Sequence, residues 1–276
     1  MLASCNETSQ KPNEKVVFTS ILPIKYFADK IVGDRYKVEL MVPPGAGPET
    51  YSPTPKQMKL MSKSSAFFAI GYLSFEIDLI QKISSINPGL KVFLVSKDIN
   101  LKRDTVDEHT DHVHLMGIDP HIWSSPKEAK IISENICEGM TAIDRADSEY
   151  YARNLKMLLR EIDKVDSTIT VVLSGSCIRK FIIFHPALGY LARDYGLEQL
   201  SIEFEGKTPS PKHMQALIDN ARKSDIKLVF IQKEFDKRNA DIVAREIGGK
   251  AVQIDPLAYN WPDQMIFIAL QFAGNP

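Results

Sequence analysis

The sequence predicts an α/β protein of two lobes, each a mainly parallel sheet flanked by helices, joined by one long helix. Apolar runs of strand length alternate with segments of helical periodicity, which is typical of parallel sheets covered by helices on both faces. A single long amphipathic segment near the middle divides this alternation into two series. The 276 residues suffice for two domains that each bury a core.

The first series begins with a buried strand at 16–22 and a helix at 24–32 that Gly33 ends. Further expected elements are strands at 37–42, 66–70 and 91–95 and helices at 55–62 and 75–83. Together these elements predict an N-terminal lobe over residues 15–147.

Two more helices should follow these strands. The first begins at Pro126, because Ser125 is a suitable N-cap and Glu128 can complete a capping box. The second is the long segment 148–170, in which apolar residues recur at intervals of three and four with charges between them. Its apolar positions are Tyr151, Leu155, Leu158, Leu159, Ile162, Val165 and Ile169. We expect this segment to link the two lobes.

The second series repeats the order of strand and helix. The expected elements are strands at 181–184, 200–204, 228–231 and 251–254, helices at 187–195, 211–222 and 238–247, and a terminal helix from 262. They predict a C-terminal lobe over residues 171–276.

The two halves resemble each other locally. Residues 52–58, Ser-Pro-Thr-Pro-Lys-Gln-Met, resemble residues 208–214, Thr-Pro-Ser-Pro-Lys-His-Met. Residues 23–33 and 186–196 each begin with proline and end with glycine. This common order of proline, helix, glycine and proline-led helix indicates that the lobes are two versions of one unit.

The composition excludes several classes of protein. Hydrophobic residues make up 44% and charged residues 25% of the chain, which is ordinary for a folded globular protein. No apolar run approaches the roughly 20 residues of a transmembrane helix. The formal net charge of -1 argues against a nucleic-acid partner, which needs a basic face. The common hydrolase, kinase and metalloprotease motifs are absent from the sequence.

Three cysteines, Cys5, Cys137 and Cys177, fit neither a disulfide framework nor a cysteine-based zinc motif. Cys137 lies on a helical apolar stripe and is expected in the core, although a bridge to Cys177 is an alternative. The four residues that end at Cys5, Leu-Ala-Ser-Cys, are typical of the end of a bacterial lipoprotein signal, after which the cysteine carries the lipid. Residues 1–14 are then expected to form a tether.

Four of the six histidines fall within thirteen positions of the chain. The segment 107–114 mixes acidic residues with His109, His112 and His114. It has the composition of a flexible, low-affinity loop that collects metal ions. The alternative is a solvated loop that is rich in histidine and has no such role.

Four polar side chains are expected at the carboxyl ends of strands, two in each lobe. His121 lies in a rigid turn before a capped helix, and Glu49 follows a loop of proline and glycine after a strand. His185 and Asp255 each close an apolar strand and precede a proline. Such strand ends are where α/β lobes bind ligands. Two imidazoles and two carboxylates suit one ion of zinc, manganese or ferrous iron clamped between the lobes.

The charges of this set help to rank the metals. Two carboxylates would neutralise a divalent ion, which lowers the cost of burying it. A bidentate Glu49 would favour manganese or iron, whereas the histidine-rich loop favours zinc, so we rank zinc first, manganese second and iron third. Glu205, which the repeat places opposite Glu49, is expected to support a ligand by a hydrogen bond.

Four ordered segments resemble one known family: the zinc- and manganese-binding class of substrate-binding lipoproteins of bacterial ABC importers. The segments are 42–55, 119–126, 184–197 and 254–257, which include Val-Pro-Pro-Gly, Asp-Pro-His-Ile-Trp, Phe-His-Pro-Ala-Leu-Gly-Tyr and Ile-Asp-Pro-Leu. The resemblance extends over nearly the whole chain. The sequence departs from the family at Glu49, where the family usually has histidine.

The resemblance implies a protein that is periplasmic or at the cell surface and delivers one divalent metal ion to the membrane subunit of an ABC permease. It implies that His121, His185 and Asp255 are ligands and that a rigid helix links the lobes and limits hinge closure. It also implies a binding protein and no enzyme. A lipid anchor at Cys5, a monomeric state and no nucleic-acid partner complete these expectations.

Three alternatives stay open. A metal-dependent hydrolase would need an open coordination position and a general base, which Glu205 could supply. A binding protein for a metal chelate or an organic solute would account for Glu49. A surface adhesin would bind host molecules even after its metal is removed.

Overall fold

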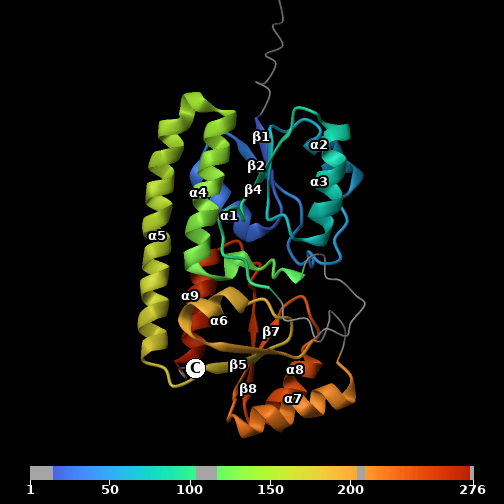
Figure 1. Ribbon diagram of the computed structural model, residues 1–276, viewed down its shortest axis with the longest axis vertical. Helices are drawn as coiled ribbons and strands as arrows, with labels where there is room; N and C mark the ends of the chain where they lie inside the picture. Colours follow the sequence, from blue (N-terminus) through green and yellow to red (C-terminus); the bar gives the residue numbers. More distant parts are fainter. Residues whose placement is uncertain (1–14, 104–116, 204–208, 274–276) are drawn as a thin grey trace, which may run out of the picture.

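The computed structural model describes residues 15–103, 117–203 and 209–273, which form two α/β lobes stacked end to end (Figure 1). The N-terminal lobe holds a parallel four-stranded sheet of order β2-β1-β3-β4. Its strands are β1 (Val16–Thr19), β2 (Lys37–Leu40), β3 (Ala66–Ala69) and β4 (Lys91–Leu94), and its helices are α1 (Leu22–Val32), α2 (Pro55–Met61), α3 (Ser74–Ile86) and α4 (Pro126–Ile143). Every residue of the central strands β1 and β3 is buried, as expected when helices cover both faces.

The C-terminal lobe repeats this arrangement with a parallel sheet of order β6-β5-β7-β8. Its strands are β5 (Lys180–Ile183), β6 (Glu198–Ser201), β7 (Leu228–Gln232) and β8 (Lys250–Ile254), and its helices are α6 (Gly189–Tyr195), α7 (Pro211–Lys223), α8 (Arg238–Glu246) and α9 (Trp261–Phe272). Both sheets follow the same strand order along the chain. The proline-led helices α2 and α7 also match, because the hydroxyls of Thr54 and Ser210 each accept a hydrogen bond from the backbone three residues on. The topology therefore supports the duplication that the repeat indicates.

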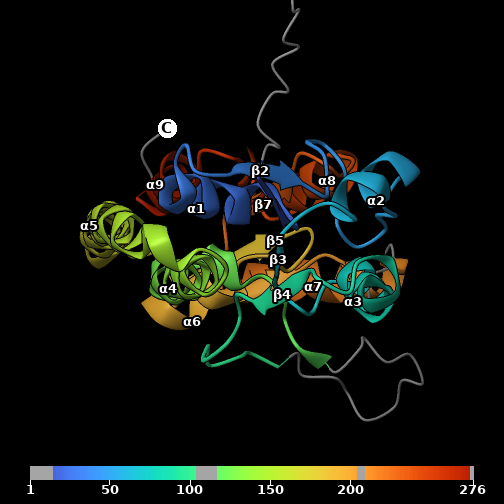
Figure 2. The same ribbon diagram turned by 90° about the horizontal axis from the view of Figure 1, so that it is seen from above.

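The helices divide in the same way around both sheets (Figure 2). In the N-terminal lobe, α1 and α4 lie on one face and α2 and α3 on the other. In the C-terminal lobe, α6 and α9 lie on the side of α1 and α4, and α7 and α8 lie on the side of α2 and α3. The long helix α5 (Ser148–Ser174) follows the short helix η3 (Arg145–Asp147) and packs against α1, α4 and α9, so it contacts both lobes.

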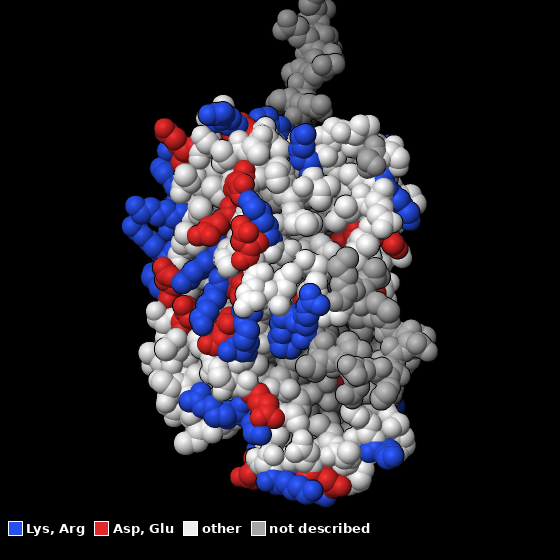
Figure 3. Space-filling view, in the orientation of Figure 1, with Lys and Arg blue, Asp and Glu red and all other residues white. Residues whose placement is uncertain are grey.

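Charged side chains of both signs mix over α4 and α5 on the face that Figure 3 shows. Lys130 of α4 pairs with Asp163 of α5 at 2.7 Å. On the side of α5 toward α1, Asn154 donates a hydrogen bond to the Ile31 carbonyl at 3.0 Å. Polar contacts on the surface thus add to the apolar stripe that fixes α5. Among the described residues, no helix combines the length and the apolar character needed to cross a membrane.

The larger hydrophobic core crosses from one lobe to the other. It includes buried side chains of both sheets and of α5. Two tryptophans close this junction: the Trp123 indole donates to the Pro256 carbonyl at 2.9 Å, and the Trp261 indole donates to the Trp123 carbonyl at 2.7 Å. The Tyr190 hydroxyl of α6 donates to the Asp119 carbonyl at 2.8 Å. The turn that carries His121 is therefore held on both sides by the C-terminal lobe.

Three local expectations from the sequence change in the structure. The strand expected at 200–204 lies at Glu198–Ser201, because its ladder ends where Ser201 pairs with Ile183, the last residue of β5. Ser125 caps α4 as expected, but Glu128 completes no capping box, since its carboxylate accepts a hydrogen bond from Arg193 of the other lobe. Finally, Cys137 is buried, Cys177 is exposed and both are free thiols, so no bridge joins them.

Candidate metal centre

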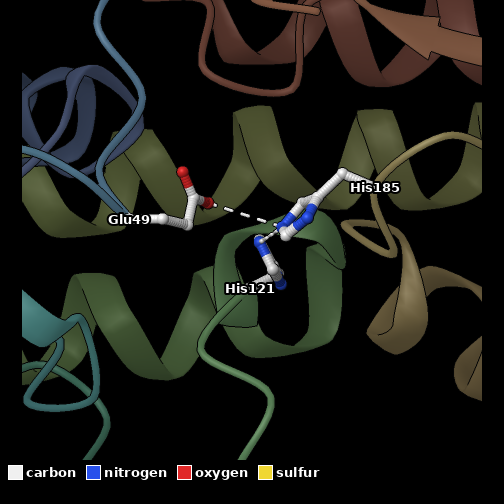
Figure 4. Close-up of side chains that lie close together, drawn as sticks. All are labelled: Glu49, His121 and His185. Atoms are coloured by element: carbon white, nitrogen blue, oxygen red, sulfur yellow. Dashed lines mark hydrogen bonds and ion pairs between the residues drawn. The ribbon is translucent and has the colours of Figure 1, made fainter. Parts of the chain in front are cut away.

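Three side chains that the sequence places at strand ends meet between the lobes: Glu49, His121 and His185 (Figure 4). The Nε2 atoms of the two histidines lie 3.2 Å apart. Glu49 Oε1 lies 3.4 Å from Nε2 of His185. One ligand atom from each residue thus lies within 4.8 Å of the other two. Among the described residues, this is the group of histidine, cysteine and acidic side chains that could hold a metal ion.

Each residue reaches this point from a different loop. Glu49 comes from the connection between β2 and α2, and His121 directly precedes the short helix η2 (Ile122–Ser124) that leads to α4. One residue separates His185 from the end of β5. These loops leave the carboxyl edges of the two sheets, and the lobes stack with those edges toward each other. The contact between histidines therefore joins one lobe to the other.

A carboxylate orients each imidazole through its other nitrogen. Nδ1 of His121 donates to Asp119 Oδ1 at 2.7 Å, and Nδ1 of His185 donates to Glu203 Oε2 at 2.6 Å. Because a carboxylate accepts and does not donate, the Nδ1 atoms carry the protons, and neutral rings have free lone pairs on Nε2. This arrangement of carboxylate and histidine is the usual support of a histidine that binds metal through Nε2. With both rings neutral, the two Nε2 lone pairs lie 3.2 Å apart, so the site favours a cation between them, either a proton or a metal ion.

The electrostatics of the site follow from these contacts. Burial acts to lower the pKa of His185, but the hydrogen bond to Glu203 and the charges of Glu49 and Glu203 outweigh it, so the pKa is raised. Burial acts to raise the pKa of the Asp119 carboxyl, yet its hydrogen bonds to His121 leave the pKa lowered. The raised pKa of His185 reflects the negative charge of Glu49 and Glu203 around its ring, and this charge attracts a cation.

A pocket with about 350 Å³ of space between the atoms opens over these residues. Phe235 stacks on the His185 ring with the centroids 5.7 Å apart, and Trp123 lies against the His121 ring at 5.2 Å. Gln232 fixes the His185 backbone, since its amide donates to the His185 carbonyl at 2.6 Å. Apolar walls around the imidazoles limit access of water and strengthen the electrostatic interactions inside the site.

Two of the three separations in this group match the edge of a zinc coordination tetrahedron. Zinc binds imidazole nitrogen and carboxylate oxygen at about 2.0–2.2 Å, so two ligand atoms on one tetrahedral ion lie about 3.3–3.5 Å apart. The distances of 3.2 Å between the imidazole nitrogens and 3.4 Å between Glu49 and His185 are close to this value. Two nitrogens and one carboxylate oxygen are also donors that suit zinc, manganese and ferrous iron.

The structure places Asp255 beside this group and not within it. Its Oδ2 atom accepts a hydrogen bond from Lys233 at 2.5 Å. Asp255 lines an adjoining pocket together with Lys233 and Glu234, and Glu234 also lines the pocket over the histidines. Burial and the charge of Asp255 raise the pKa of Glu234, although a backbone hydrogen bond and the charge of Lys233 act to lower it. The fourth candidate ligand is therefore close to the site but paired with a lysine.

Several predicted residues lie outside the part of the chain that the structure describes. They are Cys5, His109, His112, His114 and Glu205. The carboxylate that contacts His185 is Glu203, which the sequence analysis missed. The repeat pairs Glu49 with Glu205 and therefore does not find it. The available signal is that Glu203 lies two residues after the end of β6, at the carboxyl edge of the sheet. Asp119 was also missed, although it stands two residues before His121 in a tight turn.

Comparisons with known proteins point to one family. A family model described as "ZnuA: Zinc-uptake complex component A periplasmic" matches residues 17–271. The "High-affinity zinc uptake system protein ZnuA" of Bacillus subtilis (strain 168) is 28% identical over 272 residues, which cover 93% of this chain and 85% of the relative.

Solved structures agree with this match. A structure described as "Crystal structure of ZnuA" is 32% identical, has a TM-score of 0.86, and aligns over 95% of this chain and 99% of its own. The laminin-binding protein Lmb of Streptococcus agalactiae is 22% identical, with a TM-score of 0.82 over 94% of this chain and 100% of its own. That second likeness shows the fold alone.

Proposed function

The chain belongs to the family of periplasmic component A proteins of zinc-uptake complexes, and we propose that it captures one divalent transition-metal ion between its lobes. It is the extracytoplasmic substrate-binding protein of an ABC importer, and its cargo passes to the membrane permease. The observation that carries the proposal is the pair of Nε2 atoms, 3.2 Å apart and each oriented from behind by a carboxylate. Zinc is the first choice of ion, followed by manganese and then iron.

We assign the ligands as Glu49 and His121 from the N-terminal lobe and His185 and Asp255 from the C-terminal lobe. Support for the first three comes from their convergence, and support for Asp255 comes from its place in the adjoining pocket. Ligands from both lobes let one ion bridge them, so capture and a small closure of the lobes are coupled. Two carboxylates balance the charge of the ion, which lowers the cost of removing it from water.

The remaining assignments follow the same family. We divide the chain into a tether at 1–14, lobes at 15–147 and 171–276, and a linking helix at 148–170. A lipid on Cys5 would hold the protein at the membrane near its permease, and we propose a monomer that carries out no catalysis. The comparisons lend no support to a hydrolase or to a carrier of chelates or organic solutes.

Metal stoichiometry tests the proposal directly. Native mass spectrometry and competition titrations with zinc and manganese should find one tightly held ion in the wild type. His121→Ala and His185→Ala should weaken binding by on the order of 100-fold or more, because each removes a ligand. Glu49→Ala should weaken binding less, since the Glu49 side chain is 43% exposed and water can replace it.

Two controls accompany these variants. His213→Ala changes a histidine on α7, away from the cluster, and should leave affinity unchanged. Replacing His109, His112 and His114 together should spare tight binding while slowing uptake from dilute solution. A wild type that holds no stoichiometric ion under any loading condition would end the metal-capture proposal.

A further inference from the structure

The Asp255 carboxylate already has a cation partner within the protein. Lys233 Nζ lies 2.5 Å from Asp255 Oδ2, and the two side chains are 48% and 20% exposed. The second oxygen, Oδ1, is buried and has no hydrogen-bond partner in the described part of the chain. A buried carboxylate oxygen without a partner is costly. One oxygen of the Asp255 carboxylate is thus paired with Lys233, and the other oxygen can accept a hydrogen bond or bind a cation.

The backbone fixes this pair at the edge of the sheet. Lys233 and Asp255 each follow the last residue of a paired strand, β7 and β8. The Lys233 amide donates to the Ile254 carbonyl at 3.2 Å, which continues the ladder between these strands by one hydrogen bond. The two side chains are therefore neighbours by register. No hinge motion between the lobes can separate them.

The pair stands at the border of the metal site. Asp255 and Lys233 line one pocket, the three clustered ligands line another, and Glu234 and Leu257 line both. Several carboxylates therefore lie around this border, and the Lys233 ammonium lies among them. Without a metal ion, this ammonium is the cation that the described residues place on Asp255.

We infer that Lys233 is a built-in competitor of the metal ion: it holds Asp255 in the metal-free protein and releases it when an ion arrives. The inference rests on the proposed function, in which Asp255 is a ligand. An Asp255 oxygen that binds a divalent ion bonds Lys233 less strongly, because the ion and the ammonium repel each other. The half-exposed Lys233 side chain can then return to water at small cost.

This exchange has two consequences. In the metal-free protein, Lys233 stabilises the strand ends by neutralising a partly buried carboxylate. In the loaded protein, the lost ion pair lowers the affinity, so the ion leaves more easily toward a permease. By linkage, any change that strengthens the Lys233–Asp255 ion pair weakens metal binding, and metal binding weakens the ion pair by the same factor. Lys233 is thus a positioning residue that tunes release.

The test compares Lys233→Gln with the matched variant Lys237→Gln. Lys237 also pairs with an aspartate, Asp241, and has a similar exposure of 51%, but neither residue lines the two pockets of the site. Both variants remove one positive charge. Lys233→Gln should lower the melting temperature of the metal-free protein and tighten zinc binding by about twofold to fivefold, the range expected for an ion pair of this exposure. Lys237→Gln should leave zinc affinity unchanged.

A second background isolates Asp255. In Asp255→Asn protein, adding Lys233→Gln should leave zinc affinity unchanged, because the pair is already absent. An equal gain in that background, no gain in the wild-type background, or weaker binding by Lys233→Gln would each overturn the inference. A wild type that binds no zinc would instead contradict the proposed function. The melting temperatures of the metal-free variants still report whether the ion pair stabilises that state.

Discussion

Two carboxylates that the ion need not touch decide how the histidines are presented. Asp119 and Glu203 each accept a hydrogen bond from Nδ1, which turns Nε2 of both rings toward the same point. Asp119 also accepts the backbone N–H of His121 at 2.9 Å, so one carboxylate fixes both the ring and the turn that carries it. The orientation of the two histidine ligands is therefore set by Asp119 and Glu203, which hydrogen-bond to them from the side away from the site.

This arrangement predicts the effect of Glu203→Gln. An amide can accept from His185 Nδ1 through its oxygen, but it lacks the charge that favours a basic, correctly oriented imidazole. We expect zinc affinity to fall by about tenfold while the fold is retained. Glu198→Gln, which removes an exposed glutamate paired with Lys180, is the matched control and should leave affinity unchanged. Competition titration measures both, and equal affinities would show that Glu203 has no such role.

The sequence indicated which residue types gather at the site, but not their contacts. Glu49, His121 and His185 could be named because each follows an apolar strand or a rigid turn, and strand ends of parallel sheets share one edge. The pairing of Asp255 with Lys233 could not be foreseen, since it depends on the register of β7 against β8. Glu203 was missed because the strand before it ends earlier than its apolar residues suggest.

At the scale of elements, α4 approaches the N-terminal sheet more closely than side chains normally allow. Gly139 makes this possible: a Cβ there would lie 2.6 Å from Phe68 Cε1 and 2.9 Å from Phe93 Cγ. These two rings, on β3 and β4, stack with their centroids 5.5 Å apart. The missing side chain on the helix is matched by two large ones on the sheet.

We therefore expect Gly139→Ala to destabilise the protein by roughly 1–2 kcal/mol, because overpacking outweighs the better helix propensity of alanine. Gly175→Ala is the control at the end of α5. Its Cβ would meet nothing nearer than 3.8 Å, and its φ of -83° suits alanine. Thermal denaturation of the metal-free variants compares the two. A Gly139→Ala protein as stable as the wild type would mean that α4 can shift without cost.

Most elements could be predicted because local signals agree with tertiary structure. A proline and an N-cap hydroxyl mark the starts of α2, α4 and α7, and amphipathic spacing marks α5 within a few residues of its ends. Predictions of local contacts failed where a residue distant in the sequence determines the contact. Glu128 fits a capping box by sequence, but Arg193 of the other lobe competes for its carboxylate. Local patterns cannot register a partner that is 65 residues away in the chain.

At the scale of the whole molecule, the core joins the lobes more tightly than two lobes and a linker suggest. Buried residues of both sheets and α5 belong to one cluster, and a second, smaller cluster lies within the C-terminal lobe. The indoles of Trp123 and Trp261 add hydrogen bonds across the junction. Large relative rotation of the lobes would expose this core, so closure around an ion is limited to small movements.

A shared core also predicts how the molecule unfolds. We expect one cooperative thermal transition, with equal calorimetric and van't Hoff enthalpies, because neither lobe keeps a complete core without the other. Zinc at 100 times its dissociation constant should raise the melting temperature of this single transition by about 5–10 °C, since binding then adds about 2.7 kcal/mol to the free energy of unfolding.

Magnesium at the same concentration is the control, because it prefers six oxygen ligands and should leave the melting temperature unchanged. Differential scanning calorimetry distinguishes the outcomes. Two separate transitions, with zinc raising only one, would mean that the lobes fold independently and that the ion binds mainly to one of them. A single transition that zinc moves as a unit requires both lobes to be folded in the state that binds the ion, which is the condition for a site built from Glu49 and His121 on one side and His185 on the other.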